Sequence, residues 1–328
     1  MPQTLDTIVI GGSAGAFTSL KSLLSNLPND LPATIFVVLH AGTGNRLRTS
    51  ELLQPHCSLP LKVAVDGMVP APGEVIFAPQ DFHMLIGENH LHLRRGPREN
   101  NFRPAIDPLF RSAAVNRGTR AAGIVLSGLL DDGSDGLAAI AAVGGLRFVE
   151  DPAAADYPDM PAQALKAAPD AERCDPRTLA ERIVEVAGMT VAPAAPAPES
   201  IRLELMIAGL ENSSMATAEK LGELSPFNCP DCNGVLWEIK EGHIRRYRCH
   251  TGHAYGAESL SAAQEEALER TLYNTLRAHR GRAELLSRMA EDAPNAFTAQ
   301  RLLKRAEECQ QDAEIIEDVL KNRSRTIL

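Results

Sequence analysis

The sequence predicts an α/β fold: a doubly wound, mostly parallel sheet with an edge hairpin, followed by a small Cys/His module and a helical hairpin. Three observations predict it. Over the first 190 residues, short continuous apolar runs alternate with segments whose apolar residues recur at helical spacing. Three cysteines then cluster within residues 225–256, and two long helical patterns follow them. The alternation is typical of a parallel sheet covered by helices on both faces.

The first part of the chain supplies the strands and helices of this sheet. Buried-type strands are expected at Thr7–Ile10, Thr34–Leu39, Glu74–Ala78, Gly123–Ser127 and Leu146–Val149. Helices are expected at Ala14–Leu27, Asp107–Val115, Asp135–Val143 and Arg177–Ala187. Residues 82–94 differ, because His83–Ile86 and His90–Leu93 flank a Gly-Glu-Asn turn. We expect a hairpin there, added at an edge of the sheet.

Composition divides the chain into four parts. Residues 1–190 form the α/β domain, and residues 191–224 form a linker that begins with the Pro/Ala-rich Val191–Ser200. The Cys/His module is expected at 225–256 and the helical hairpin at 257–328. The two helices, at about 258–290 and 297–322, are separated at Pro294, because proline ends helices.

Bulk composition excludes several classes of function. The formal net charge is -9 and aromatic residues make up 4% of the 328 residues, whereas general nucleic-acid binders carry excess Lys and Arg and often aromatic stacking residues. No secretory signal precedes the first strand, and no apolar run approaches the roughly 18 residues of a membrane span. We therefore expect a cytoplasmic protein without membrane insertion that is not a nucleic-acid binder.

A glycine-rich turn with a serine, Gly11-Gly12-Ser13-Ala14-Gly15, lies between the first strand and the first helix. A dinucleotide-binding loop would need a second glycine where Ser13 stands and an acidic residue after the next strand, which ends in His40 instead. The nucleophile elbow of the α/β-hydrolases follows several strands, not the first. Both patterns thus fit the turn less well than two other interpretations of Ser13: a helix cap, and the nucleophile of another serine hydrolase on a doubly wound sheet.

Two further side-chain types favour the hydrolase. His40 ends the second strand, and Asp131 and Asp132 follow the strand Gly123–Ser127. The carboxyl ends of parallel strands share one rim, where ligands bind. Serine, histidine and aspartate are expected to meet there, although each residue alone is also explained by a turn, a cap or a strand end. An aspartate beside a histidine fixes the tautomer of the imidazole and stabilises its protonated form.

These residues resemble the catalytic domain of the CheB chemotaxis methylesterases, from about Thr7 to about Ala187. The similarity extends to Gly73–Pro79, to Phe82-His83-Met84 and to Met160-Pro161. It also includes Gly96–Asn100, followed by Arg103–Phe110. Several separate motifs in the right order carry the resemblance.

The resemblance implies a catalytic triad of Ser13, His40 and Asp132, since the family's aspartate directly precedes glycine. It implies hydrolysis of γ-glutamyl methyl esters on a chemoreceptor helix, and in some relatives glutamine deamidation, with no cofactor needed for catalysis. Backbone N–H groups near Ser13 and Leu129 would stabilise the oxyanion. Relatives often carry an N-terminal receiver domain; here the first strand begins at about residue 5, so control by such a domain is expected to be missing.

The Cys/His module has the ligand spacing of a structural zinc site. Cys229, Cys232 and Cys249 follow the pattern C-x2-C-x16-C, and histidines stand one and four residues later. Because structural zinc takes four Cys/His ligands, His253 is the preferred fourth ligand and His250 the alternative. Val235–Ile239 and Arg245–Arg248 are expected to form a hairpin, as in zinc ribbons. Free thiols on a small hairpin remain the alternative to a metal site.

Two further hypotheses remain open. In the first, the chain is a regulatory scaffold whose zinc module and helices bind a signalling partner, with the α/β fold retained beside them. In the second, it is a nucleotide-binding domain that uses the glycine loop. The basic residues Arg245, Arg246 and Arg248 would allow contact with nucleic acid, but the long helices that follow favour contact with protein.

Overall fold

A computed structural model describes residues 3–40, 47–210, 221–239 and 244–325. The chain divides into two compact units, Met1–Leu260 and Ser261–Leu328. The first holds the α/β domain and the Cys/His module, and the second holds most of the two long helices. None of the described helices is long and apolar enough to cross a membrane.

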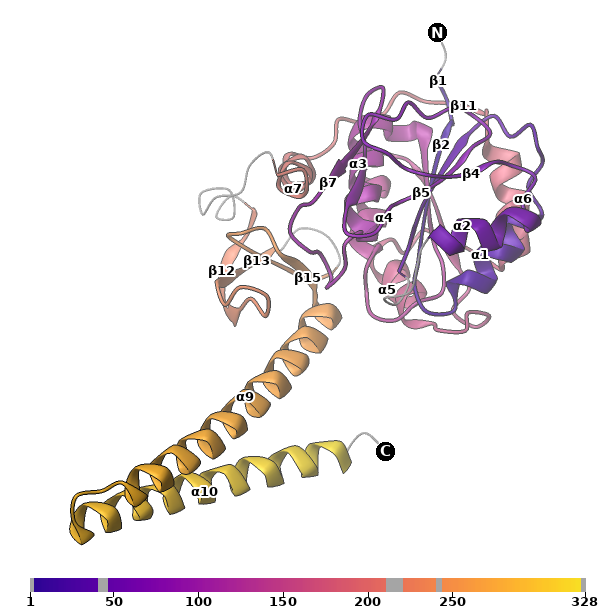
Figure 1. Cartoon of the computed structure of the whole chain (residues 1–328). Helices are drawn as coiled ribbons and strands as arrows, with labels where there is room; N and C mark the ends of the chain where they lie inside the picture. Colours follow the sequence, from indigo (N-terminus) through magenta and orange to yellow (C-terminus); the bar gives the residue numbers. More distant parts are fainter. Residues whose placement is uncertain (1–2, 41–46, 211–220, 240–243, 326–328) are drawn as a thin grey trace. The chain divides into compact units, whose positions relative to one another are not determined.

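The α/β domain is built on a seven-stranded sheet in which every pairing is parallel, in the order β10-β9-β8-β2-β3-β5-β4. Its strands are β2 (Thr7–Gly12), β3 (Thr34–Leu39), β4 (Leu61–Val63), β5 (Val75–Phe77), β8 (Ala121–Val125), β9 (Leu146–Glu150) and β10 (Glu172–Cys174). Its helices are α1 (Ala16–Ser25), α2 (Leu47–Leu53), α3 (Ile106–Arg117), α4 (Ser134–Ala142), α5 (Asp159–Ala167) and α6 (Pro176–Val186). The predicted doubly wound sheet is confirmed (Figure 1).

Helices cover both faces of the sheet, as the continuous apolar strands predict. Side chains alternate along the central strand β2: Ile8 and Ile10 join the cluster that contains α1 and α6. Val9 joins the other cluster, which contains α3, α4 and α5. Both faces are therefore buried, and polar chemistry is left to the strand ends.

The predicted hairpin exists, but it does not extend the edge of the sheet. Strands β6 (His83–Ile86) and β7 (Leu91–Arg94) form a separate antiparallel pair. The outer backbone groups of β6 bond to α3 instead: Ile86 N–H donates to Ser112 Oγ, and Asn116 Nδ2 donates to Ile86 O. Side chains of α3 thus form the hydrogen bonds that the backbone of a neighbouring strand in the sheet would otherwise form with β6.

Several short elements carry no sequence pattern that would have predicted them. The edge strands β4 and β10 have three residues each, and the helices α2 and α5 have seven and nine. Strands β1 (Gln3–Thr4) and β11 (Thr190–Val191) pair antiparallel and close the domain. The 3₁₀ turns Gln54–His56 and Gly118–Arg120 complete it. Such segments are too short for a periodic signal and owe their conformation to their neighbours.

The segment expected as a linker contains a helix. Helix α7 (Glu199–Ala208) begins after Pro198 and buries Glu204, Ile207 and Ala208. The module that follows is a four-stranded antiparallel sheet in the order β12-β13-β14-β15. Its strands are β12 (Glu223–Asn228), β13 (Val235–Ile239), β14 (Arg246–Cys249) and β15 (Ala254–Gly256). The predicted β13–β14 hairpin is present, and a further strand flanks it on each side.

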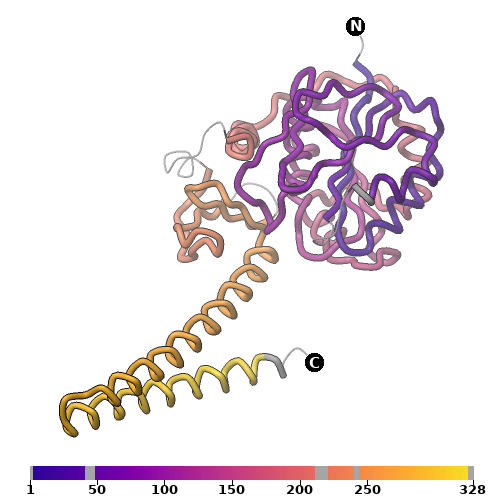
Figure 2. Tube along the Cα trace, viewed as in Figure 1, coloured from indigo at the N-terminus to yellow at the C-terminus, as the bar shows by residue number. Residues whose placement is uncertain are grey.

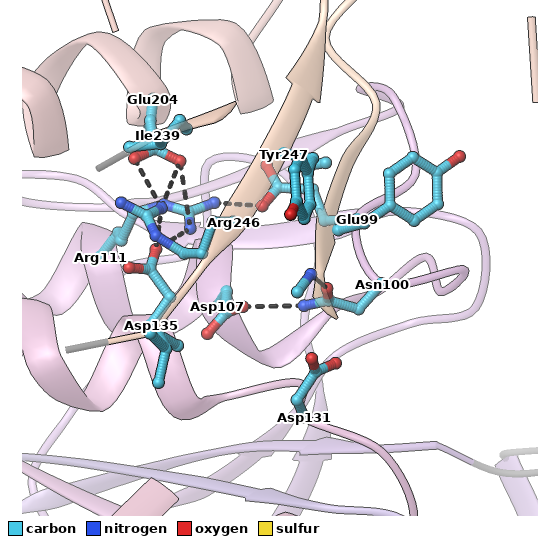
Figure 3. A pocket seen from close by; sticks show the side chains of 14 residues that line it. Glu99, Asn100, Asp107, Arg111, Asp131, Asp135, Glu204, Ile239, Arg246 and Tyr247 are labelled. Carbon is cyan, nitrogen blue, oxygen red and sulfur yellow. Dashed lines mark hydrogen bonds and ion pairs between the residues drawn. The ribbon is translucent and has the colours of Figure 1, made fainter. Parts of the chain in front are cut away.

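The module contacts the α/β domain through a buried arginine–carboxylate cluster, part of which is drawn in Figure 3. Its six members are Arg111, Arg246, Arg248, Glu99, Asp135 and Glu204. Arg246 Nη1 lies 2.7 Å from Asp135 Oδ2 and 2.8 Å from Glu204 Oε1. Arg248 Nη2 lies 2.8 Å from Glu204 Oε2 and 3.2 Å from Glu99 Oε1.

Charge balance explains how the two glutamates of the cluster, Glu99 and Glu204, remain ionised inside the protein. Burial alone would raise the pKa of Glu204, but the guanidiniums of Arg246, Arg248 and Arg111 hold that pKa well below its usual range. Three arginines face three carboxylates, so each buried charge is paired. Because Arg246 and Arg248 are buried here, the basic surface expected of the module is not formed by them.

The C-terminal helices form the predicted hairpin, α9 (Ala257–Glu291) and α10 (Ala296–Arg325), which lie side by side (Figures 1 and 2). Leu276 packs with Ala313 and Leu320 between them. Arg280 pairs with Glu317 across the hairpin. Helix α9 is continuous from the end of β15 to the turn at Pro294.

Arg248→Met should lower the free energy of unfolding by about 3 kcal/mol, because it leaves Glu99 and Glu204 short of a buried partner. Trp237, the only tryptophan, is buried opposite Arg248 in the module, so its fluorescence in a urea titration reports the change.

The matched control is Arg245→Met, since the Arg245 side chain is 79% exposed. It should change the same free energy by less than about 0.5 kcal/mol. Equal losses in the two variants would contradict the structural role of the buried cluster.

Candidate active site

Three neighbouring strands bring the predicted catalytic residues to one rim of the sheet. In the β2–β3 ladder Gly12 pairs with Leu39, so Ser13 and His40 are the next residues on each strand. The His40 N–H donates to Gly12 O at 2.9 Å. Strand β8 lies on the other side of β2 and leads to Asp131 and Asp132. The chain also reverses its direction of winding at β2, and such points form ligand crevices.

Ser13 is not a helix cap. Helix α1 begins at Ala16, and its cap residue is Gly15, which has a left-handed φ of 76° and makes no side-chain cap bond. The Ser13 N–H donates to Ser127 O at 2.9 Å, so the backbone is held, while no described residue forms a hydrogen bond with the Ser13 hydroxyl. A Cβ on Gly128 would lie 2.9 Å from Ser13 Cβ, so glycine keeps the space beside the serine open.

His40 is held from two sides. Its Nε2 lies 2.9 Å from Asp132 Oδ2, although the alignment departs from that of a straight hydrogen bond. Phe102 stacks on the imidazole with ring centroids 3.6 Å apart and planes at 13°. His40 Nδ1 is buried and has no hydrogen-bond partner among the described residues. The structure thus joins His40 to Asp132 and leaves the second ring nitrogen free, with no described bond to Ser13 Oγ.

Asp132 lies at the N-terminus of α3. Its carboxylate accepts the Ile106 N–H at 2.7 Å, the Asp107 N–H at 3.2 Å and the Asn100 Nδ2 at 2.9 Å. Burial alone would raise the pKa of Asp132, but His40, the Ile106 N–H and the Asn100 amide together hold that pKa below its usual range. Asp132 is therefore an ionised carboxylate suited to orienting a histidine.

Asp131, the neighbouring aspartate, has a different role. It accepts the Glu258 N–H at 3.1 Å and the Ser259 N–H at 3.3 Å, and it bonds the Ser259 hydroxyl. These are the first residues of α9, so Asp131 caps that helix. Of the two aspartates, only Asp132 has a described contact with His40.

Three residues near the site were not singled out by sequence reasoning: Asn100, Phe102 and Glu150. Asn100 stands within the stretch that carries the family resemblance, which was the only signal available. Phe102 contacts His40 through a loop whose path no sequence pattern predicts. Glu150, at the end of β9, is 2% exposed.

Glu150 supports the backbone behind Ser13. Its carboxyl accepts the Ser127 N–H at 2.7 Å and the Ser19 hydroxyl at 2.7 Å, and the Ser127 carbonyl in turn accepts the Ser13 N–H. Burial raises the pKa of Glu150 above its usual value, despite the two hydrogen bonds that lower it.

The four preferred metal ligands form a cluster. Ligand atoms of Cys229, Cys232, Cys249 and His253 all lie within 4.8 Å of one another. Sγ atoms of Cys232 and Cys249 are 3.7 Å apart, and His253 Nδ1 is 3.5 Å from Cys249 Sγ and 3.6 Å from Cys229 Sγ. His250, the alternative ligand, is not part of this cluster; its ring lies beside Gly234.

A family model described as CheB methylesterase matches residues 8–183, more than half of the chain. The chain belongs to the CheB methylesterase family. A solved structure titled as the Thermotoga maritima CheB methylesterase catalytic domain is similar to it with a TM-score of 0.55 and 28% identity, covering 56% of this chain and 100% of that chain. The CheB fold therefore accounts for the α/β domain.

Curated CheB relatives are similar over the same part. A Methanosarcina mazei protein named protein-glutamate methylesterase/protein-glutamine glutaminase 2 is 33% identical over 169 residues, 49% of this chain and 46% of its own length. A Bordetella avium protein named protein-glutamate methylesterase/protein-glutamine glutaminase 1 is 38% identical over 164 residues, 49% of this chain and 48% of its own length. The chain thus spans about half the length of the curated relatives it matches.

The pH dependence of stability should reveal the raised pKa of Glu150. The pKa of Glu150 lies above the usual 4.5 in the folded state. Between these two pKa values the folded protein therefore binds more protons than the unfolded chain does. The contribution of Glu150 to the free energy of unfolding is lost as pH rises from 4.5 through the folded pKa. Glu150→Gln should remove this loss, because the glutamine side chain does not titrate. The Oε1 of the glutamine can accept the Ser127 N–H, and its Nε2 can donate to Ser19 Oγ. Urea unfolding from acidic to neutral pH measures it.

Relative to the unmodified chain, the Glu150→Gln variant should therefore gain stability as pH rises. The exposed Glu181→Gln variant on α6 serves as the control and should follow the unmodified chain at every pH. Parallel stability curves for all three proteins would show that Glu150 is not perturbed.

Proposed function

We propose that this chain is a serine hydrolase that removes methyl esters from glutamate side chains of chemoreceptors, with Ser13, His40 and Asp132 as its catalytic triad. The observation that carries the proposal is the buried His40 at the strand end beside Ser13, with Nε2 2.9 Å from Asp132 and Nδ1 without a hydrogen-bond partner among the described residues. Membership of the CheB family and the names of the curated relatives support this substrate class.

The geometry assigns a role to each nitrogen of His40. Ionised Asp132 favours the tautomer with hydrogen on Nε2, which leaves Nδ1 as the base. His40 Nδ1 removes the proton from Ser13 Oγ as that oxygen attacks the ester carbonyl carbon. The resulting imidazolium then gives this proton to the methoxy oxygen, and methanol leaves. Water, activated in the same way, hydrolyses the acyl-enzyme and releases the glutamate carboxylate and Ser13.

Two backbone N–H groups are suited to hold the developing oxyanion. The Ser13 N–H is already bonded to Ser127 O and the Gly128 N–H to Tyr157 O. Within the described part of the chain, the N–H groups of Ala14 and Leu129 donate to no other group, and these residues flank the nucleophile. They are our candidates for the oxyanion hole. The same steps with an amide release ammonia, which is glutamine deamidation.

Ser13→Ala should lower methanol release from a methylated receptor by about 1,000-fold or more, because no other described group replaces the nucleophile. Methanol is measured by an alcohol-oxidase-coupled assay. Ser25→Ala, at the exposed end of α1, is the matched control and should keep full activity.

A serine-reactive phosphonate separates the hydrolase from the scaffold hypothesis. Mass spectrometry should locate the phosphonate on Ser13 in the unmodified chain and find none in the Ser13→Ala variant. Full methanol release by the Ser13→Ala variant would overturn the triad, and no labelling of the folded protein would favour a scaffold that acts through its C-terminal region.

We also propose that the Cys/His cluster holds a structural zinc ion. Zinc bonds of about 2.3 Å to sulfur and about 2.0–2.1 Å to nitrogen at tetrahedral angles require ligand atoms roughly 3.5–3.8 Å apart. The separations of 3.5, 3.6 and 3.7 Å fit that requirement. A bound ion supplies no step of the ester hydrolysis; it would tie the two turns of a small module that has few buried apolar residues of its own.

The full chain as purified should contain one zinc per molecule, measured by elemental analysis. Cys232→Ser should lose most of the zinc and lower the melting temperature seen by Trp237 fluorescence, because three ligands remain. Cys309→Ser, on α10 and outside the cluster, should keep both. Equal zinc content in the two variants would rule out this ligand set.

A further inference from the structure

Asn100 lies between the zinc module and Asp132. It belongs to the loop that follows β7, is 4% exposed, and has a left-handed φ of 50° that asparagine adopts more readily than most residues. Its backbone N–H donates to Ala254 O in β15 at 2.8 Å. The adjacent Glu99 lies beside the same strand and pairs with Arg248. The loop is thus bound to the module by backbone and side chain.

The amide group of Asn100 connects the module to the acid of the triad. Its Oδ1 accepts the Gly256 N–H at 2.8 Å. Its Nδ2 donates to Asp132 Oδ1 at 2.9 Å and to Asp107 Oδ2 at 2.8 Å, the latter bond being drawn in Figure 3. Every polar atom of the side chain is used. Rotating the amide by half a turn would oppose donor to donor at Gly256 and acceptor to acceptor at both carboxylates.

The Gly256 N–H and the Asp132 carboxylate therefore favour the same end of the amide toward Asp132. Without the Gly256 N–H, the amide loses its hydrogen bond to the module, and Asn100 Nδ2 is held less firmly against Asp132. Phe102, two residues farther along the same loop, stacks on the His40 ring. Both the acid and the base of the triad are thus held by one loop, and strand β15 is the outer support of that loop.

We propose that Asn100 is a positioning residue for the hydrolase, and that β15 of the zinc module, through the Gly256 N–H, orients it so that Asp132 stays aligned with His40. The inference rests on the proposed function, because Asp132 serves as the triad acid there. In this arrangement the module is a working part of the active site, although none of its described residues bonds to Ser13.

Asn100→Ala tests the first part. It should lower kcat about 100-fold and change KM little, since Asn100 is buried and a small shift of Asp132 misaligns the base. The matched control is Asn101→Ala. Asn101 also has a left-handed φ, 71°, and bonds Ser259 O at 3.3 Å, but no described bond joins it to a catalytic carboxylate. It should keep kcat within about threefold.

Gly256→Ala tests whether the Gly256 N–H of the module orients Asn100, and it leaves the Asn100 side chain itself unchanged. The added Cβ would stand 2.0 Å from Asp131 Oδ2, so β15 or the Asp131 carboxyl group must shift, and a shift of β15 draws the Gly256 N–H away from the amide. Gly281→Ala in α9 is the control, because its Cβ would meet nothing within 4 Å. We expect Gly256→Ala to lower kcat about 10-fold or more with zinc still bound, and Gly281→Ala to leave it unchanged.

Ring ¹⁵N NMR of His40 supplies a readout that does not need activity. The ring signals are assigned by their loss in His40→Gln and are recorded at alkaline pH in the full chain. The unmodified chain should show hydrogen on Nε2. Asn100→Ala and Gly256→Ala should each show a mixture of both tautomers, whereas Asn101→Ala and Gly281→Ala should not.

These measurements separate the two proposals. If the unmodified chain shows the fixed Nε2–H tautomer, Asn100→Ala mixes it, and no ester is hydrolysed, the positioning role holds and the proposed substrate fails. If Asn100→Ala and Gly256→Ala keep the single tautomer and full kcat while Ser13→Ala is inactive, the hydrolase stands and the positioning role of Asn100 is overturned.

Discussion

The rest of the site depends on the way a negative charge is held inside the protein at Asp132. The carboxylate is 1% exposed, and such a charge persists only where donors replace water. Four elements provide them: the first turn of α3, the loop that carries Asn100, the end of β3 with His40, and the backbone of the following Gly133. Because each donor comes from a different part of the chain, fixing the charge also fixes where these parts meet.

Much of this arrangement followed from sequence pattern. The β3 strand Thr34–Leu39 and the β13 strand Val235–Ile239 have the bounds their apolar residues predicted, and the rule that parallel strands share a rim placed Ser13 beside His40. Asn100 and Phe102 were not predicted, because a loop with no periodicity carries them. Helix α7 in the expected linker was not predicted either. Its buried Glu204 is paired with arginines from distant parts of the sequence, and a local sequence pattern does not reveal such pairing.

The buried arginine–carboxylate cluster has a cost as well as a role. Desolvating six ionised groups is unfavourable, and an apolar interface of the same shape is often as stable or more so. Charged pairs, however, tolerate few alternative alignments, because a shifted arginine leaves a carboxylate unpaired. The cluster therefore sets the register in which β15 lies against Asn100. Asp107 shows what happens to a buried carboxyl group that is less well compensated by cations. Burial and the neighbouring Asp132 raise the pKa of Asp107 well above the usual range.

The sequence distance spanned by these contacts affects how the protein is made. Asn100 meets Gly256 across 156 residues, and Asp131 meets Ser259 across 128. During synthesis the α/β sheet is complete well before β15 leaves the ribosome, since domains fold from the N-terminus onward. Until then Glu99 has Arg111 but not Arg248, and the amide of Asn100 has no strand to orient it. The nascent chain thus completes the α/β sheet before the Gly256 N–H can reach the Asn100 amide and before Arg248 can reach Glu99.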